Sequence, residues 1–275
     1  NLPIPDGTTA HAVGGTLIAL LLGPYAACIA ISVALFIQAI IFGDGGILSF
    51  GANCFNIAFI LPFTGFFIYK ILNKIHLSPF YHKCTIFLSA YISINLAAFF
   101  TALELGIQPL LFVDNLAQPL YCPYPLWISI PAMALSHLTI AGIAEGLFTL
   151  SLYLFILKTS PNIIYDSQQI KLNSIFSLLA FLIIISPLGL IAEGTAWGEW
   201  APEEILNDTS SGVPLGFIPE KLLNGFNYEA FFPDYTMSGT TDILAYIASA
   251  IIGVALLIII FKILRSIIYA KKQSL

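Results

Sequence analysis

Long apolar runs alternate with short polar breaks along almost the whole chain. Seven segments are apolar enough to form helices in a membrane: 9–22, 24–42, 51–72, 83–106, 128–157, 171–193 and 239–270. Most of them reach or approach the roughly 20 residues that are needed to cross a hydrocarbon core. The Gly23-Pro24 step separates the first two, because glycine ends a helix and proline starts one. The first segment is short, so it forms either a span or a partly re-entrant helix.

The composition predicts an all-α, polytopic helical membrane protein with about seven helices. Hydrophobic residues make up 58% of the 275 residues and charged residues 9%, whereas a soluble domain carries roughly 25% charged residues. The four cysteines form no CxxC pair, which argues against a cysteine-ligated zinc or iron–sulfur site. The net charge of −5 argues against binding to nucleic acid.

The basic residues predict how the chain is oriented. If all seven segments cross the membrane, nine of the ten Lys and Arg residues fall on one side and only Lys221 falls on the other. The positive-inside rule then places the C-terminus in the cytoplasm and Asn1 outside. The loop of residues 194–238 therefore faces outward, and its acidic, aromatic sequence is typical of a cap on the membrane surface.

Several polar residues interrupt the apolar segments and are candidates for a binding site or pathway. Inserting a carboxylate at mid-membrane costs about 2.5–3.5 kcal/mol of free energy. We therefore expect Glu145 either to take part in a binding site or pathway or to form a hydrogen bond between helices. His137 lies two turns earlier, near the same face, with an interhelical hydrogen bond as its alternative role. The others lie at the outer ends of other segments, where helix capping is the alternative: Gln38, Asp44, Asn53, Asn56 and Glu104.

Small residues recur every four positions along the first segment, at Gly15, Ala19 and Gly23. Such a stripe permits close contact between helices. It predicts either packing inside the chain or docking against a partner membrane protein.

Three stretches carry a family resemblance: "LPIPDGTTAHAVGGTLIALLLGPYAA", "QAIIFGDGGILSFGANCFNIAFILPFTGFFIYK" and "SHLTIAGIAEGLFTL". From residue 2 to about 160 the chain resembles the CbiM/NikM family, the substrate-binding membrane subunits of cobalt and nickel energy-coupling-factor transporters. The resemblance implies a six-helix capture core with one additional N-terminal helix. It also implies that Co²⁺ or Ni²⁺ is held near the outer surface by nitrogen ligands, which these metals favour over the oxygen ligands of Mg²⁺ and Ca²⁺.

The segment "DGTTAHAVGG" matches a ligand-bearing motif of that family, so the resemblance makes His11 a metal ligand. The resemblance implies that the other ligands of the metal, an N-terminal amine and a histidine in the second position, are expected upstream of Asn1, together with two helices. Residues 1–160 are thus expected to form the core without its first two helices. Residues 161–275 resemble the two-helix accessory subunit of the CbiN/NikN type, whose outward loop, here 194–238, is expected to help load the metal.

The resemblance predicts a transporter subunit in a prokaryotic cell membrane, without an organic cofactor, that captures Co²⁺ or Ni²⁺ for ATP-driven import. The chain contains no Walker motif. We therefore expect ATP hydrolysis to come from partners: a coupling subunit of the CbiQ/NikQ type and ATPases of the CbiO/NikO type. Two alternatives remain. An intramembrane metalloenzyme would use His11, His137 and Glu145 but lacks HExxH, and an ion-coupled carrier using Glu145 would show inverted repeats, which the sequence lacks.

Overall fold

The computed structural model describes residues 2–3, 9–10, 13–75, 78–161, 172–191, 195–226 and 228–273. A two-residue antiparallel pair, β1 (Leu2–Pro3) and β2 (Thr9–Ala10), precedes the helices. The longer α-helices are α1 (Gly15–Leu22), α2 (Pro24–Ile37), α4 (Leu61–Leu72), α5 (Pro79–Leu111), α6 (Leu126–Ser136), α7 (Gly142–Thr159), α8 (Leu172–Ile185) and α11 (Asp242–Gln273). The short ones are α3 (Phe50–Asn53), α9 (Pro202–Asn207) and α10 (Glu220–Leu223).

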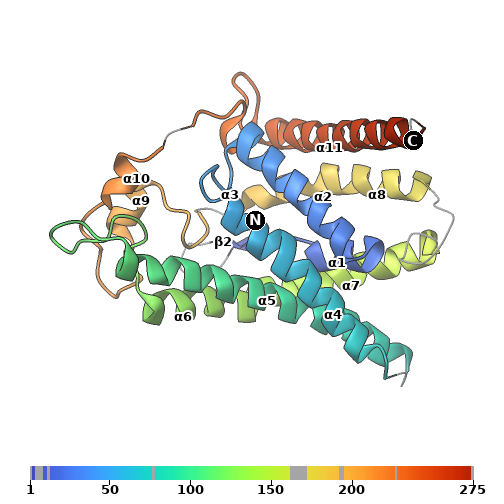
Figure 1. Cartoon of the computed structure of the whole chain (residues 1–275), viewed down its shortest axis with the longest axis horizontal. Coiled ribbons are helices and arrows are strands. Elements are labelled where there is room, and N and C mark those ends of the chain that lie inside the picture. Colours follow the sequence, from blue (N-terminus) through green and yellow to red (C-terminus); the bar gives the residue numbers. More distant parts are fainter. Residues whose placement is uncertain are drawn as a thin grey trace.

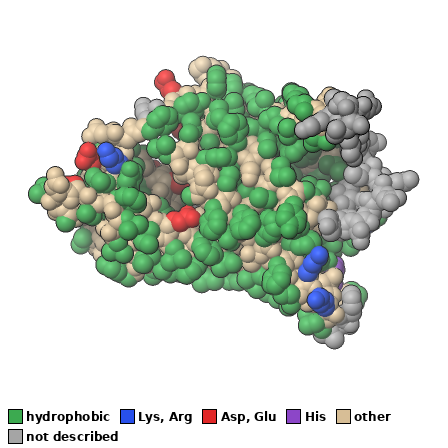
Figure 2. Space-filling model, viewed as in Figure 1, with side chains coloured by type: hydrophobic (Ala, Val, Ile, Leu, Met, Phe, Trp, Pro, Cys, Tyr) green, Lys and Arg blue, Asp and Glu red, His purple; other side chains and the backbone are tan. Residues whose placement is uncertain are grey.

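Within the part of the chain that the structure describes, five helical stretches are long and apolar enough to cross a membrane. They are Pro24–Phe42, Phe50–Leu72, Pro79–Leu111, Leu126–Thr159 and Asp242–Ile268, and Ile175–Ile191 is a shorter apolar helix. The prediction of a helical membrane protein is therefore confirmed, whereas the number seven is approximate. Figure 2 shows hydrophobic side chains over most of one face, as expected for a surface in contact with lipid.

Helices α5, α6, α7, α8 and α11 run roughly along the longest axis of the molecule, whereas α2 and α4 are inclined to it (Figure 1). We call one end the loop end, because it holds residues 112–125 and the described part of 195–241. We call the other the basic end, because α4, α7 and α11 finish there, with Lys70 and Lys158 in the last turns of α4 and α7 and Arg265 in the last third of α11. The charge asymmetry of the sequence is thus an asymmetry between the two ends of the bundle.

Helix α1 lies at the centre of the bundle and is only half a span. The predicted helical start at residue 9 is wrong, since Thr9 and Ala10 belong to β2 and the helix begins at Gly15. Eight residues rise about 12 Å, less than half of a hydrocarbon core about 30 Å thick. Most of its side chains are buried among other helices: Leu17 and Leu20 pack in one buried cluster with Ile86 of α5 and Tyr153 of α7.

The stripe of small residues on α1 faces the chain's own helices. A Cβ added to Gly15 would lie 2.2 Å from Cδ2 of Leu61 on α4. Ala19 has no exposed surface and packs with Ala27 of α2, and Gly23 is buried as well. The stripe therefore serves packing inside the chain. Because these three positions offer no free surface, we propose no partner docking on them.

The contact between α5 and α6 generates a test of this packing. A methyl group on Gly106 would lie 2.2 Å from Oγ of Ser129 and 2.9 Å from the backbone Cα of Leu126. We expect Gly106→Ala to destabilise the protein by about 1–3 kcal/mol, the usual range for overpacking. Thermal unfolding of the purified protein measures the effect.

Gly51→Ala is the matched control, because Gly51 is also helical and nothing lies within 4 Å of the added Cβ. This variant should be as stable as the wild type or slightly more stable, since alanine is the better helix former. Equal melting temperatures for the two variants would show that the Gly106 contact does not set the spacing of α5 and α6.

Candidate functional site

The N-terminal end of α1 is held by one buried carboxylate. Glu145 of α7 has no exposed surface and lies just past the midpoint of the Leu126–Thr159 span. Its Oε2 accepts a hydrogen bond from the backbone N–H of Val13 at 2.9 Å, and its Oε1 accepts one from Gly14 at 2.9 Å. Free N–H groups and the helix dipole both make a helix start attractive to an anion. Glu145 thus caps a half-helix that begins inside the bundle.

The local backbone at this start is suited to the contact. Gly14 has a φ of +70°, a left-handed conformation that glycine adopts at low cost, and it precedes the first residue of α1. Thr16, the second residue of the helix, shares a 2.6 Å hydrogen bond with Ser93 of α5. Helix α1 is therefore fixed to α7 at its start and to α5 just beyond it.

His11, the predicted metal ligand, lies outside the described residues, so its position stays a prediction. It stands two residues before Val13 in the sequence. Glu145 therefore fixes the backbone two residues after this histidine.

Three of the predicted polar residues lie in π-helical turns. Gln38 begins η1 (Gln38–Phe42), Asn56 lies in η2 (Cys54–Ile60) and His137 begins η3 (His137–Ala141). A π turn interrupts the regular α-helical hydrogen bonding, and such turns occur frequently at functional sites. Helical periodicity in the sequence does not reveal them.

Asn56 pairs with a carboxylate of the neighbouring span. Its Nδ2 donates to Oε2 of Glu104 on α5 at 2.7 Å, and the residue is only 2% exposed. Its Oδ1 has no hydrogen-bond partner among the described residues. This pair links η2 to α5 near the loop end, so Asn56 does more than cap its own helix.

His137 makes its described contacts within its own helix. Nδ1 lies 2.9 Å from the carbonyl oxygen of Met133 and 3.1 Å from Oγ of Ser136. Asn53 is also used locally: its Nδ2 donates to the carbonyl of Gly45 at 2.9 Å and closes the turn after η1. The His137 contacts thus lie within its own helix, whereas the structural alternative predicted from the sequence was a hydrogen bond between helices, and the Asn53 contact closes a turn.

A cluster of hydrogen-bonded polar groups at the loop end, which we call the Asp44 knot, joins the two halves of the chain, residues 1–160 and 161–275. Oδ2 of Asp44 accepts hydrogen bonds from Nε2 of Gln38 at 2.6 Å and from the hydroxyl of Tyr235 at 2.5 Å. Tyr235 lies in η6 (Pro233–Tyr235) and stacks on Phe42 with ring centroids 4.8 Å apart. The N–H of Phe232 adds a backbone hydrogen bond of 2.9 Å to the carbonyl of Ile41.

Glu199 adds a second acid close to this knot. The turn before it passes tightly over α5, since a Cβ on Gly198 would lie 2.7 Å from Cδ1 of Leu105, and Gly198 has a φ of +100°. Although Glu199 retains exposed surface, the protein packed around its carboxyl group and the charge of Asp44 raise its pKa to about 7. Burial and the Asp44 carboxylate likewise raise the pKa of Tyr235.

A second contact between the halves is aromatic and was missed by the sequence analysis. Tyr124, almost fully buried, donates its hydroxyl to the carboxylate of Asp208. Its ring lies 5.9 Å from that of Trp197 and 5.5 Å from that of Trp200. Trp197 also packs on Met133 and neighbouring small residues of α5. The aromatic content of both loops was the available signal, but it did not identify these pairs.

No group of three or more His, Cys, Asp or Glu side chains within the described part of the chain could hold a metal ion. The described residues fix the start of α1 through Glu145 and join residues 195–241 to the first part of the chain at the loop end. The chemistry of the ligands has to be tested at His11.

Comparison with known proteins gives a consistent result along the chain. The family described as "Cobalt uptake substrate-specific transmembrane region" matches residues 1–163, and the PDGLE domain matches residues 172–270. The probable fused nickel transport protein LarMN of Lactiplantibacillus plantarum is 44% identical, over 95% of this chain and 79% of its own length. The fused nickel transport protein NikMN of Rhodobacter capsulatus is 41% identical, over 94% of this chain and 79% of its own.

Two solved structures share the fold of more than half of the chain. A crystal structure of a transition metal transporter is 47% identical, has a TM-score of 0.55 and covers 64% of this chain and 73% of its own. A truncated transition metal transporter is 51% identical with a TM-score of 0.54, over 57% of this chain and 72% of its own.

The Glu145 contact predicts a large loss of stability on substitution. Glu145→Ala leaves the N–H groups of Val13 and Gly14 without their acceptor in the interior, at about 1–3 kcal/mol for each group. Glu145→Gln retains one acceptor oxygen and should lose less. Thermal unfolding in detergent compares these variants with Glu220→Gln, whose exposed side chain makes it a control. A Glu145→Ala protein as stable as this control would contradict the capping role.

The raised pKa of Glu199 predicts that the stability of the folded protein depends on pH. Its folded-state pKa of about 7 lies above the ordinary value of about 4.3, so the folded protein binds the proton more tightly. Stability from this group should rise as the pH falls from about 7 to about 4.3, and should be absent above pH 7. Unfolding measured across this range should show the effect in the wild type. The difference between the wild type and Glu199→Gln should stay constant with pH if Glu199 does not titrate in this way.

Proposed function

Because the chain belongs to the family of cobalt uptake substrate-specific transmembrane proteins, we propose that it captures Ni²⁺ or Co²⁺ at the loop end for ATP-driven import. The family and the relatives make it a multi-pass membrane protein and a component of metal transport, not an enzyme. The LarMN and NikMN relatives described above match nearly the whole chain and are named for nickel transport, so we propose Ni²⁺ as the cargo to be tested first.

The contact between Glu145 and the start of α1 is the observation that carries this proposal. It fixes the backbone at Val13 and Gly14 in mid-span, and two residues of chain span at most about 7 Å. We propose that His11 thereby supplies an imidazole nitrogen to the cation within the bundle. A neutral imidazole suits nickel and cobalt, and a fixed backbone lowers the entropic cost of positioning it.

We propose that the chain has two working parts, residues 1–160 and 161–275. The second part covers the loop end of the first through the Asp44 knot and the contact between Tyr124 and Asp208. In this position the loop of residues 194–238 can admit or retain the cation. The acidic side chains Asp44 and Glu199 favour the approach of a divalent cation over that of an anion.

The basic end is proposed to face the cytoplasm, following the positive-inside rule. There the chain would meet a transmembrane coupling subunit and cytoplasmic ATPases. An ion-coupled carrier would use Glu145 to exchange protons. Both oxygens of Glu145 already accept backbone hydrogen bonds at the start of α1, which favours a structural use of this carboxylate.

Metal titration tests the ligand assignment. Isothermal titration of the full-length protein with Ni²⁺ and with Co²⁺ should show tight binding, and His11→Ala should abolish it. His82→Ala is the control, since Nδ1 of His82 contacts Asn73 near the basic end. Uptake of the metal by cells should fall with His11→Ala and should require the ATPase subunits.

Two results would contradict this account. Retained affinity in His11→Ala would remove His11 from the site, whatever the transport mechanism. Undiminished uptake in cells that lack the ATPase subunits would instead favour an ion-coupled carrier.

A further inference from the structure

The two halves of the chain are separated, deeper in the bundle, by a groove. It has a volume of about 460 Å³ and lies between α2 and η1 of the first part and α8 and α11 of the second, with η5 (Ser186–Ile191) at one side. At the loop end the Asp44 knot closes the same interface with hydrogen bonds and stacked rings. The groove thus continues, deeper in the bundle, the interface that the Asp44 knot closes at the loop end.

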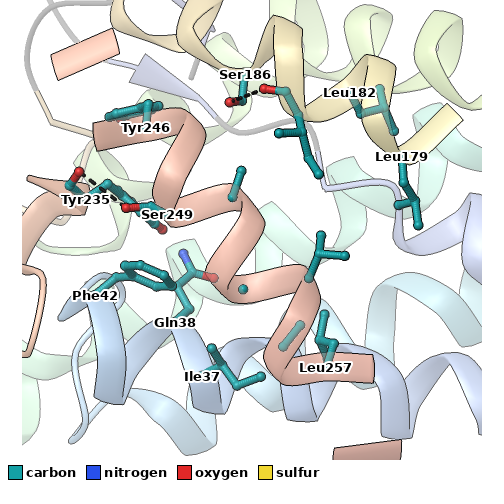
Figure 3. Close-up of a pocket in the computed structure, with 15 residues that line it drawn as sticks. Ile37, Gln38, Phe42, Leu179, Leu182, Ser186, Tyr235, Tyr246, Ser249 and Leu257 are labelled. Carbon is teal, nitrogen blue, oxygen red and sulfur yellow. Dashed lines mark hydrogen bonds between the residues drawn. The ribbon is translucent and has the colours of Figure 1, made fainter. Parts of the chain in front are cut away.

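The polarity of the groove lining changes along the bundle axis. Its polar groups lie at the loop ends of the helices, on Gln38, Ser186, Tyr235, Tyr246 and Ser249. Farther from the loop end the lining is aliphatic, for example Ala34, Leu179 and Leu257. Figure 3 shows this separation, with Gln38, Tyr235 and Ser249 near one another and Leu179, Leu182 and Leu257 away from them.

Such a groove matches the shape of an amphiphile with its polar end toward the loop end. Helices in a bilayer gain little from burying apolar surface, since lipid is equally apolar, and associate mainly through van der Waals contact. An empty gap would forfeit that contact along the aliphatic lining. An acyl chain would restore it and would leave its headgroup beside the Asp44 knot.

The charge at the mouth of the groove favours one kind of headgroup. The carboxylate of Asp44 accepts hydrogen bonds from Gln38 and Tyr235, which both line the groove. Lys221 is the only basic residue between Lys171 and Lys262 in the sequence, and Glu220 is its neighbour at 3.9 Å. An anionic headgroup would be repelled, whereas an ammonium group finds carboxylates and the rings of Phe42, Tyr235 and Tyr246.

We propose that this groove binds one acyl chain of a membrane phospholipid with an ammonium headgroup, of the phosphatidylethanolamine type. The lipid would fill the interface between α2 and the C-terminal helices α8 and α11. It would add van der Waals contact between the two parts at a depth that the Asp44 knot does not reach.

Native mass spectrometry of the full chain, with phosphatidylethanolamine or phosphatidylglycerol added, tests the proposal. Gly253→Leu fills the groove from α11, because the nearest atom to an added Cβ is Cε2 of Phe42 at 4.0 Å. Retained phosphatidylethanolamine should fall by about tenfold, the change that 1.4 kcal/mol of lost contact produces. Ala255→Leu is the matched control, on an exposed position of the same helix outside the groove.

Two further variants keep the test decisive if Gly253→Leu does not fold. Ala34→Leu fills the groove from α2 and should also lose the lipid. Asp44→Asn keeps an acceptor but removes the charge, so it should reduce the preference for phosphatidylethanolamine over phosphatidylglycerol.

Equal lipid retention by the wild type and the groove variants would overturn the proposal. Phosphatidylglycerol bound as tightly as phosphatidylethanolamine by the wild type would overturn it as well. A dimer of the chain that disappears in Gly253→Leu would assign the groove to a second copy instead.

Discussion

A half-helix inside a membrane needs an acceptor for its first N–H groups, and the structure depends on how this need is met. In hydrocarbon no water is present to bind them, so each free donor would be costly. Glu145 supplies both oxygens from the middle of the neighbouring span. The carboxylate and the N–H groups at the helix start stabilise each other, because each is a polar group whose burial would be costly without a hydrogen-bond partner. This pairing allows the chain before α1 to lie at mid-depth, where His11 is proposed to act.

The sequence predicted the long spans well because their signal is local and strong. The predicted segments 24–42 and 51–72 lie within a residue of the observed spans, since apolar length alone defines them. The start of α1 was misjudged by several residues. Its real beginning depends on the left-handed Gly14 and on a carboxylate 131 residues away, and helical periodicity contains neither.

The candidate residues were recognised more reliably than their contacts. Glu145 and Asn56 stood out as polar residues in apolar surroundings, and both are buried. Their partners, however, come from distant parts of the chain, as does the partner of Asp44, Tyr235. The spacing of small residues on α1 could not show which neighbour they face. That question depends on three-dimensional packing, which a single sequence does not reveal.

The three π turns have a consequence for how the chain tolerates changes in length. A π turn contains one residue more than an α turn, so loss of one residue there leaves a regular helix with both flanking faces preserved. The same loss within α5 would rotate every later side chain by about 100° relative to its neighbours. Deletions of a single residue are therefore best absorbed at η1, η2 and η3, the turns that contain Gln38, Asn56 and His137.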